Sequence, residues 1–288
     1  MVTQGEDICS ECGALLSLSC RHCPTCRADA GAPNVRDCLR KENSEALTAR
    51  FTEATARASA KGCSKEFATL LQLVDQKSGV VVSVPPGIAR SLVDNPEFLY
   101  TNYERLVAAN ARKHANPEDD RRRCAVGGSL FGSFAENIVY GALSLTEEGI
   151  STYGAVHCRL RSVAIKKRTS FLETNSSKFF QDHRIVIGDA LPVGYRAAWE
   201  HRQRLVLAKL ADSLSVGQTE SDWQAILIHS DRNNRNNDDY VEAHIYESFD
   251  INAIESMVAA LGIRTSRAEK IDIDVAIGYF KRLGGKKK

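Results

Sequence analysis

The sequence of residues 8–38 is ICSECGALLSLSCRHCPTCRADAGAPNVRDC. It has too few large apolar side chains to form a hydrophobic core unaided. It holds two Cys-x2-Cys pairs, Cys9 with Cys12 and Cys23 with Cys26. Each pair places two thiolates on the same side of a tight turn, and two such turns facing each other complete a tetrahedron of ligands around Zn²⁺. The spacing therefore predicts a zinc ribbon closed by these four cysteines.

The sequence does not decide the exact set of four ligands, because Cys20 and His22 lie close enough to the second pair to replace one of them. Gly13 and Pro24 favour tight turns at the two pairs. The alternative interpretation is a redox pair or a set of incidental cysteines. A site closed by four protein ligands has no open coordination position, which indicates a structural role. We expect the module to hold a surface that binds a partner.

The composition of the whole chain narrows the class of protein. At 288 residues and 43% apolar content, the chain can form one main domain and at least one smaller module. The 38 basic and 36 acidic residues nearly balance, so net charge gives no reason to expect a nucleic-acid or membrane partner. We find no apolar run of bilayer length and no secretion signal. With the cysteines outside the cluster scattered, we expect the reducing cytoplasm of the producing cell or of a target cell.

We expect three parts along the chain: a zinc ribbon over residues 1–40, a helical region over 41–120 and a further domain over 121–288. The last boundary is placed at the charged, proline-containing segment 116–123. The fold class is therefore α+β.

Within the helical region, apolar residues recur every three or four positions from 41 to 76, which predicts amphipathic helices broken at Gly62. Residues 80–84 predict a short strand, and residues 96–115 predict another helix.

The remaining part alternates between strand and helix patterns. β-Branched and aromatic residues predict strands over 155–161, 184–187, 223–229 and 240–246. We expect helices over 194–213 and 251–261. Together these predict a mainly antiparallel or mixed sheet.

Two polar segments of this part are candidates for ligand binding. On the strand 155–161, the alternate residues His157, Arg159 and Arg161 share one face and could bind phosphates, although a solvent-exposed charged face is the alternative. The hydroxyl-rich segment 168–177 could support a site, and helix capping is its alternative role.

A third segment, residues 239–247, reads DYVEAHIYE. Glu242 and His244 point to one side of the predicted strand, and Val241, Ala243 and Ile245 to the other. A carboxyl group beside an imidazole is a candidate acid/base or charge-stabilising pair.

In order and spacing, these segments resemble a group of bacterial and phage-encoded domains that look like ADP-ribosyltransferase toxins. The residues that carry the resemblance are Tyr153-Gly154, Arg168-x-Ser170-Phe171, Asn175-Ser176 and Tyr240-x-Glu242-x-His244. The likeness covers about residues 125–265. In the family pattern a glutamine stands where this chain has His244.

The resemblance implies a split, mixed-sheet fold that binds NAD in a cleft between two small sheets. It implies that Glu242 is catalytic, because a carboxylate beside the ribose stabilises the oxocarbenium-like cation formed as nicotinamide leaves. The family pattern further implies that His157 or Arg159, with Arg161 on the same face, binds pyrophosphate or ribose. In the same way, Ser170 or Ser176 braces the loop, and His244 orients the acceptor.

We therefore expect a mono-ADP-ribosyltransferase toxin or effector that uses NAD, with the zinc module and the helices serving recognition. The acceptor, a protein or a nucleic acid, stays open. The rival interpretation is a non-catalytic zinc-ribbon protein that binds nucleic acid or acts as an interaction scaffold. Its candidate phosphate contacts are Arg21, Arg27, Arg36, Arg40, Lys41 and Arg121 to Arg123. These cations are interleaved with acids and lack stacking aromatics.

Overall fold

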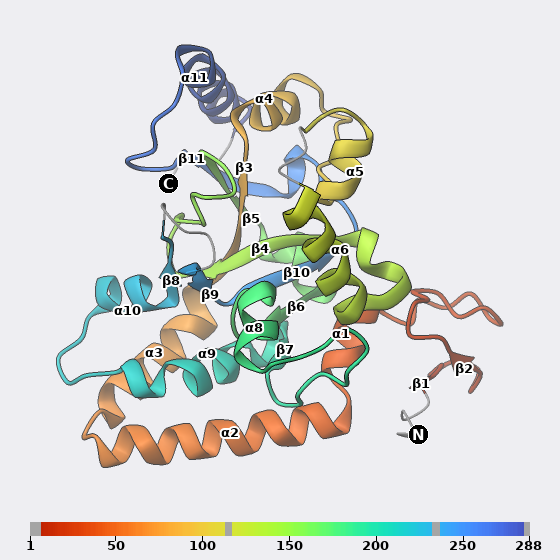
Figure 1. Cartoon of the computed structure of the whole chain (residues 1–288), viewed down its shortest axis with the longest axis vertical. Coiled ribbons are helices and arrows are strands. Elements are labelled where there is room, and N and C mark those ends of the chain that lie inside the picture. Colours follow the sequence, from red (N-terminus) through yellow and green to blue (C-terminus); the bar gives the residue numbers. More distant parts are fainter. Residues whose placement is uncertain (1–6, 113–116, 232–236, 285–288) are drawn as a thin grey trace.

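The computed structural model describes residues 7–112, 117–231 and 237–284 (Figure 1). Its centre is a sheet of seven strands, in which each strand is antiparallel to its neighbours. The strand order is β11-β5-β3-β4-β10-β6-β7. The strands are β3 (Gly79–Val84), β4 (Ile138–Ser144), β5 (Val156–Leu160), β6 (Thr169–Leu172), β7 (Arg196–Ala198), β10 (Glu242–Tyr246) and β11 (Ile254–Ala259). A short pair, β8 (Ile228–His229) with β9 (Asp239–Tyr240), lies beside the sheet.

The main hydrophobic core covers one face of the sheet. There the apolar side chains of β3, such as Val80 and Val82, and of β10, such as Ala243 and Ile245, pack against helices. Those helices are α2 (Lys41–Ala60), α3 (Ser64–Lys77), α4 (Pro86–Asp94), α9 (Arg202–Leu210), α10 (Glu220–Leu227) and α11 (Arg267–Arg282). In Figure 1 α2 lies at the bottom of the molecule, and α4 and α11 lie at the top. None of the described helices has the length and apolar character needed to cross a membrane.

The opposite face of the sheet carries a smaller core and the polar side chains of β10. Leu172 and Tyr246 pack there with Phe131, Phe134 and Phe179. The helices that pack into this smaller core are α6 (Pro117–Phe131) and α8 (Ser176–Asp182), whereas α5 (Tyr103–Ala108) contributes Leu106 to the main core. Because side chains alternate along a strand, Glu242 and His244 point to this face, away from the main core.

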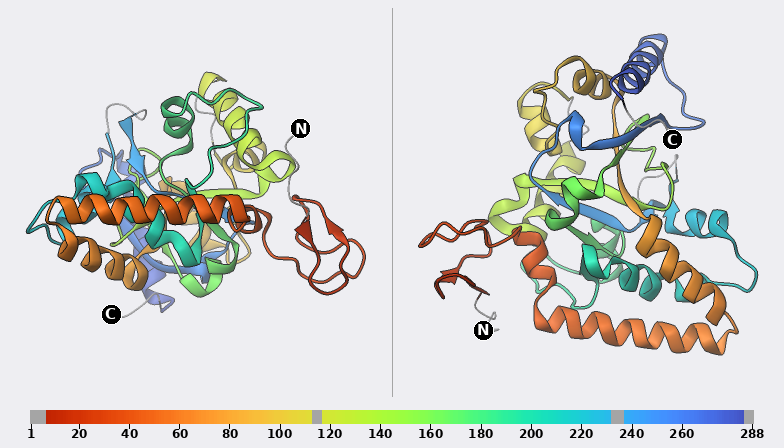
Figure 2. Two further views of the ribbon diagram at one scale, coloured as in Figure 1. Left: turned by 90° about the horizontal axis from the view of Figure 1, so that it is seen from below. Right: turned by 180° about the vertical axis from the view of Figure 1, so that it is seen from behind.

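The N-terminal module projects from one side of the body (Figures 1 and 2). It contains the short antiparallel pair β1 (Asp7–Ile8) and β2 (Leu15–Leu16). Helix α1 (Pro33–Cys38) follows and lies against β6 and β7. The remaining short elements are α7 (Ser162–Ile165), η1 (Gly132–Asn137), η2 (Lys166–Arg168), η3 (Trp199–His201), η4 (Ala211–Ser213) and η6 (Ile251–Ala253).

The combination of helices with an antiparallel sheet is confirmed, but two expectations about its organisation are not met. First, β3 comes from the expected helical region 41–120 and lies in the middle of the sheet, between β5 and β4. The boundary near residue 120 therefore does not separate two folding units. Second, the cleft between two small sheets is replaced by a single continuous sheet of seven strands.

Several predicted elements match, and others differ for local reasons. Helices α2 and α3, the break at Gly62 (φ +74°), β3, β5 and β10 are as expected. The expected helix 194–213 is instead the edge strand β7 followed by α9. Gly194 (φ +84°) has a backbone conformation that a helix cannot contain. The expected helix 251–261 is one turn, η6, followed by the strand β11, which pairs with β5.

Three further segments differ. The expected strand 184–187 is a turn, and Arg184 has a positive φ of +53°. Residues 223–227 belong to α10, which begins at a capping box formed by Thr219 and Asp222. In the expected helix 96–115, only α5 is helical among the described residues, and 113–116 lie outside them. The expected charged joint is the start of α6 at Pro117.

Candidate functional site

The four predicted cysteines come together within the N-terminal module. The sulfur atoms of Cys9, Cys12, Cys23 and Cys26 all lie within 4.8 Å of one another. The Sγ–Sγ distances are 3.6 Å for Cys9–Cys26 and for Cys12–Cys23. A tetrahedron with Zn–S bonds of about 2.3 Å has sulfur atoms about 3.8 Å apart, so this cluster can hold a metal ion such as zinc.

The same turn occurs twice around this cluster. In the first copy the N–H of Cys9 donates to the carbonyl of Ala14 (2.8 Å), and the N–H of Gly13 donates to the carbonyl of Cys9 (2.9 Å). In the second copy Cys23 donates to Ala28 (2.8 Å), and Arg27 donates to Cys23 (2.9 Å). Gly13 and Arg27 occupy the same position and both have positive φ, +72° and +67°. These equivalent turns aim two thiols each at one point.

Neither alternative ligand belongs to this cluster. The Cys20 thiol donates to the carbonyl of Ser17 (3.1 Å). His22 forms an isolated β-bridge with Asp29. The cluster therefore consists of the two Cys-x2-Cys pairs.

Glu242, at the start of β10, is buried at 5% exposure and is held by three donors. Its Oε2 accepts a hydrogen bond from the backbone N–H of Ser176 (3.1 Å) and lies 2.9 Å from Nε2 of His244. Its Oε1 accepts a longer bond, 3.4 Å, from the hydroxyl of Tyr240. Ser176 is the first residue of α8, so the carboxylate meets one of the free N–H groups at a helix start.

The loop before α8 is fixed in place by capping and by β9. The Asn175 side chain accepts from the N–H of Lys178 (3.1 Å), which caps α8. Its amide also donates to the carbonyl of Asp238 (2.8 Å), and the hydroxyl of Thr174 donates to Asp239 (2.6 Å). These bonds hold the Ser176 N–H against the carboxylate.

Glu242 lies in the wall of a cavity of ≈ 260 Å³, just below the range of about 300–1,000 Å³ that is usual for small-molecule sites. The lining combines aromatic, basic and amide or hydroxyl side chains. It includes Tyr100, Tyr103, Tyr140, Tyr153, Tyr240, Arg112, Arg122, Arg123, Ser83, Asn102, Asn175, Ser176 and Ser177.

The arginines bring positive charge to the cavity wall. The Arg123 guanidinium lies 3.9 Å from the centre of the Tyr103 ring and 3.3 Å from Asp120. Arg122, with 41% of its side chain exposed, pairs with Asp119 (2.9 Å). A guanidinium group can bind a phosphate, and an aromatic ring beside it can stack on a base.

The residues of the predicted anion-binding face lie next to the cavity but do not line it. His157 is buried, and its Nδ1 lies 2.9 Å from the hydroxyl of Ser83, which does line the cavity. Burial lowers the pKa of His157 to about 4, so its ring is neutral at pH 7.

Arg159 and Arg161 are used for internal contacts instead. Arg159 donates to the carbonyls of Thr146 and Lys77, both at 2.6 Å. Arg161 donates to the carbonyl of Ile254 (3.0 Å). The structure does not bring these two guanidinium groups to the cavity.

The two predicted serines have different places, and His244 lies behind Glu242. Ser176 lines the cavity, whereas the Ser170 hydroxyl is buried and accepts a bond from Asn34 (3.0 Å). His244 is 1% exposed, and its ring packs edge-on against Phe131 and Tyr140, with centroids 4.9 and 5.4 Å apart. It contacts the carboxylate of Glu242 and does not line the cavity.

Sequence reasoning missed most of the cavity wall. Tyr140 on β4 and Tyr103 at the start of α5 lay in segments without a motif. In the sequence, Arg122 and Arg123 stand out only as part of a basic tract. What these residues share is their chemistry, since aromatic and basic side chains from separate segments line one cavity.

The cations of the rival nucleic-acid interpretation are partly used for internal contacts. Arg21 pairs with Asp29 (3.3 Å) and Glu247 (2.8 Å). Arg36 donates to three backbone carbonyls of the N-terminal module. Arg40 lies 3.3 Å from Asp37. The contact between Arg21 and Glu247 joins the module to the body, and the others lie within the N-terminal segment itself.

The structure thus contains a cysteine cluster suited to a metal ion and, on the sheet, a buried carboxylate in a cavity lined by tyrosines and arginines. Comparison of the chain with protein-family models and with curated proteins gives no match.

Proposed function

We propose that the chain is an NAD-dependent mono-ADP-ribosyltransferase that modifies a macromolecular acceptor, with the zinc module serving recognition. The observation that carries the proposal is the carboxylate of Glu242, buried in the wall of a cavity and oriented by three donors. The motifs that resemble ADP-ribosyltransferase toxins place the catalytic glutamate at this same position.

The chemistry requires a carboxylate of this kind. The bond between the ribose C1′ and the nicotinamide nitrogen breaks, the electron pair leaves with neutral nicotinamide, and the ribose becomes an oxocarbenium-like cation. The acceptor nucleophile then forms a bond to C1′ and loses its proton. A fixed carboxylate beside the ribose stabilises this cation without reorganising during the reaction.

The two oxygens of Glu242 are not equivalent. Oε2 is held by the Ser176 N–H and by His244, whereas among the described residues Oε1 has only the long bond from Tyr240. Oε1 is therefore the oxygen that can accept a hydrogen bond from a ribose hydroxyl. The ring of Tyr240 packs edge-on against that of Tyr153, with centroids 6.4 Å apart, and this contact fixes the direction from which its hydroxyl approaches Oε1.

The rest of the cavity suits a dinucleotide. Arg112, Arg122 and Arg123 provide guanidinium groups for the pyrophosphate. The tyrosines provide ring faces for the nicotinamide or the adenine.

The test is NAD cleavage and transfer by purified wild-type chain and by Glu242→Gln, with labelled NAD and a cell lysate as the source of acceptor. The amide keeps the shape and loses the charge, so we expect kcat to fall by about 10²- to 10³-fold with KM nearly unchanged. Glu173→Gln is the matched control, because Glu173 pairs with Arg50 (2.6 Å) and does not line the cavity. Full activity in Glu242→Gln, or no NAD cleavage and no thermal stabilisation by NAD in the wild type, refutes the proposal.

A further inference from the structure

The amide of Asn34 joins the N-terminal part of the chain to the strand that carries Glu242. Asn34, in α1, is 2% exposed. Its Nδ2 donates to the carbonyl of His244 (2.8 Å), the hydroxyl of Ser170 (3.0 Å) and, at 3.3 Å, the carbonyl of Arg168. His244 and Ser170 are directly paired between β10 and β6. One side chain therefore fixes two neighbouring strands at the same level.

Asn34 binds the backbone carbonyl of His244, and the imidazole ring of the same histidine binds the carboxylate of Glu242. Nε2 of His244 lies 2.9 Å from Oε2 of Glu242, and the ring is packed between Phe131 and Tyr140. A small displacement of the His244 backbone would move Nε2 relative to the carboxylate. A misplacement of about 1 Å near a reacting centre can lower a rate by about 10²-fold.

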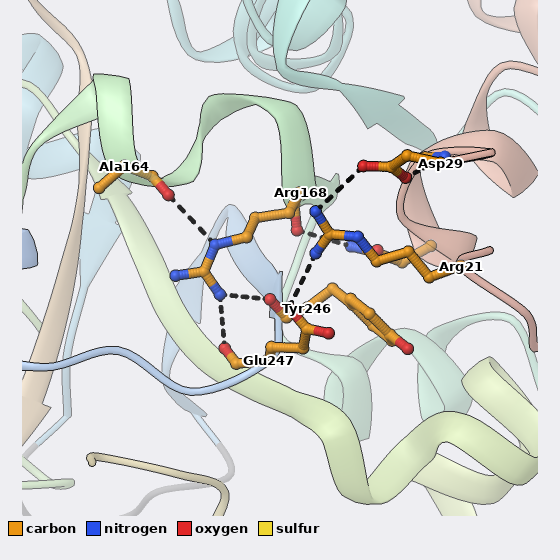
Figure 3. A network of polar contacts seen from close by, with 8 residues as sticks. Arg21, Asp29, Ala164, Arg168, Tyr246 and Glu247 are labelled. Atoms are coloured by element: carbon orange, nitrogen blue, oxygen red, sulfur yellow. Dashed lines mark hydrogen bonds and ion pairs between the residues drawn. The ribbon is translucent and has the colours of Figure 1, made fainter. Parts of the chain in front are cut away.

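The N-terminal module also contacts the chain at the C-terminal end of β10. Figure 3 shows Arg21 of the N-terminal module reaching the carboxylate of Glu247 (2.8 Å). In the same network Arg168 donates to the carbonyls of Glu247 (2.7 Å), Ala164 (3.1 Å) and Tyr246. The N-terminal module and α1 therefore contact β10 both at His244 and just beyond its end.

We propose that Asn34 is a positioning residue for Glu242, acting through His244. Asn34 sets the position of the His244 backbone, and the imidazole of His244 sets the position of the carboxylate. The effect on catalysis rests on the proposed function, whereas the effect on the geometry of His244 and Glu242 does not.

The test compares Asn34→Ala with a matched variant, Asn43→Ala. Asn43 is also 2% exposed, and its Nδ2 donates to the carbonyls of Cys38 (2.7 Å) and Arg196 (2.9 Å). It therefore fixes α2 to β7, at the edge of the sheet, by the same kind of bond. The Asn43 Oδ1 also accepts from the N–H of Gly194 (2.9 Å). Both variants lose a buried amide that joins distant segments, and of the two only Asn34→Ala removes a contact with β10.

The first readout is the ring-nitrogen NMR signals of His244 in NAD-free protein, assigned with a His244→Gln variant. We expect Asn34→Ala to shift these signals and Asn43→Ala to leave them unchanged. The same His244 signals in Asn34→Ala as in the wild type, or an equal shift in both variants, overturn the proposal. Should Asn34→Ala not fold, Ser170→Ala decides in its place. It removes one acceptor of the Asn34 amide and should shift the signals in the same direction.

The second readout is the kinetics of NAD cleavage. We expect Asn34→Ala to lower kcat by between about 10- and 100-fold with KM little changed, and Asn43→Ala to keep both values near the wild type. A rise in KM alone overturns the catalytic part. If the wild type does not cleave NAD, the proposed function fails, while the NMR comparison still decides whether Asn34 positions His244.

Discussion

The side chain of Glu242 is buried, and the donors that contact it are fixed by the fold. An ionised carboxylate removed from water costs several kcal/mol unless it is hydrogen-bonded. The Ser176 N–H, His244 and Tyr240 supply these bonds from α8, β10 and β9. Burial raises the pKa of Tyr140 and of Tyr240 well above the usual value, and the Glu242 charge adds to both shifts. Both phenols therefore keep their protons, and Tyr240 remains a donor.

We predict that His157 makes the stability of the protein fall in mild acid. Its pKa is about 4 in the folded chain and about 6.5 when unfolded, so between these values the unfolded chain binds the extra proton. The contribution of neutral His157 to the free energy of unfolding is fully present above about pH 6.5 and decreases as the pH falls toward 4. From pH 7 to pH 5 the free energy of unfolding should drop by about 2 kcal/mol from this residue alone. Urea unfolding of the wild type and of His157→Gln at the two pH values measures it, and equal losses in both proteins would contradict the prediction.

The sequence could predict which side chains share a face of a strand, but not what that face meets. The alternation in β10 placed Glu242 beside His244, and the alternation in β5 placed His157 on the same side of the chain as Arg159. Whether a guanidinium reaches a ligand depends on the loops above the strand. Arg159 is used by carbonyls of Thr146 and Lys77, which are far from it in the sequence. Tyr140 on β4 and Arg123 on α6 also reach the cavity through the tertiary fold, which the local sequence does not reveal.

Among the elements, the loop between β4 and β5 depends on a glycine that touches β3. A Cβ at Gly154 would lie 2.2 Å from the carbonyl carbon of Val84 and 2.6 Å from its nitrogen. Both are backbone atoms of a central strand and cannot move aside. The loop carries Tyr153 into the cavity wall, so this close contact also places a residue of the candidate site.

We therefore predict that Gly154→Ala destabilises the protein by about 3 kcal/mol, because overpacking against the backbone forces the loop or the strand to shift. Gly128→Ala is the control. Gly128 lies within α6, a Cβ there meets nothing within 4 Å, and alanine favours a helix. Thermal unfolding should show a lower Tm for Gly154→Ala and an unchanged or slightly higher Tm for Gly128→Ala. Equal Tm values in the two variants would show that the contact with Val84 does not constrain the loop.

Elements with strong local signals were predictable, and elements made by pairing were not. Helices α2 and α3 have apolar periodicity and a glycine between them, and both form. Residues 251–261 begin with a capping Asp250, whose side chain does accept from Asn252, but the turn ends at Ala253. The chain then becomes β11 because β5 offers an unpaired edge. Hydrogen bonds to a distant strand thus outweigh a local helix signal.

In the molecule as a whole, one core joins segments that the sequence suggested were separate. β3 is flanked by β4 and β5, which come about 60 and 75 residues later in the chain, and its apolar face meets helices from both halves. Such long-range pairing leaves no mark in local composition, so the sequence predicted a boundary near residue 120. The N-terminal module differs, because its closure depends on ligands near in sequence. For that reason its organisation could be read from spacing.

We predict that the fold of the N-terminal module depends on bound zinc. The purified chain should hold one equivalent of zinc, and Cys12→Ser should lose it, whereas Cys20→Ser should retain it, because Cys20 lies outside the cluster and donates to Ser17. Structural zinc contributes roughly 10–16 kcal/mol to the folding of isolated zinc modules, more than their few apolar side chains can replace. We therefore expect trypsin to cut Cys12→Ser, or zinc-depleted wild type, at the exposed Arg27, while circular dichroism of the main sheet is preserved. Metal analysis and mass spectrometry of the fragments measure both effects. Zinc retained by Cys12→Ser, or lost by Cys20→Ser, would show that the metal is held by a different set of ligands.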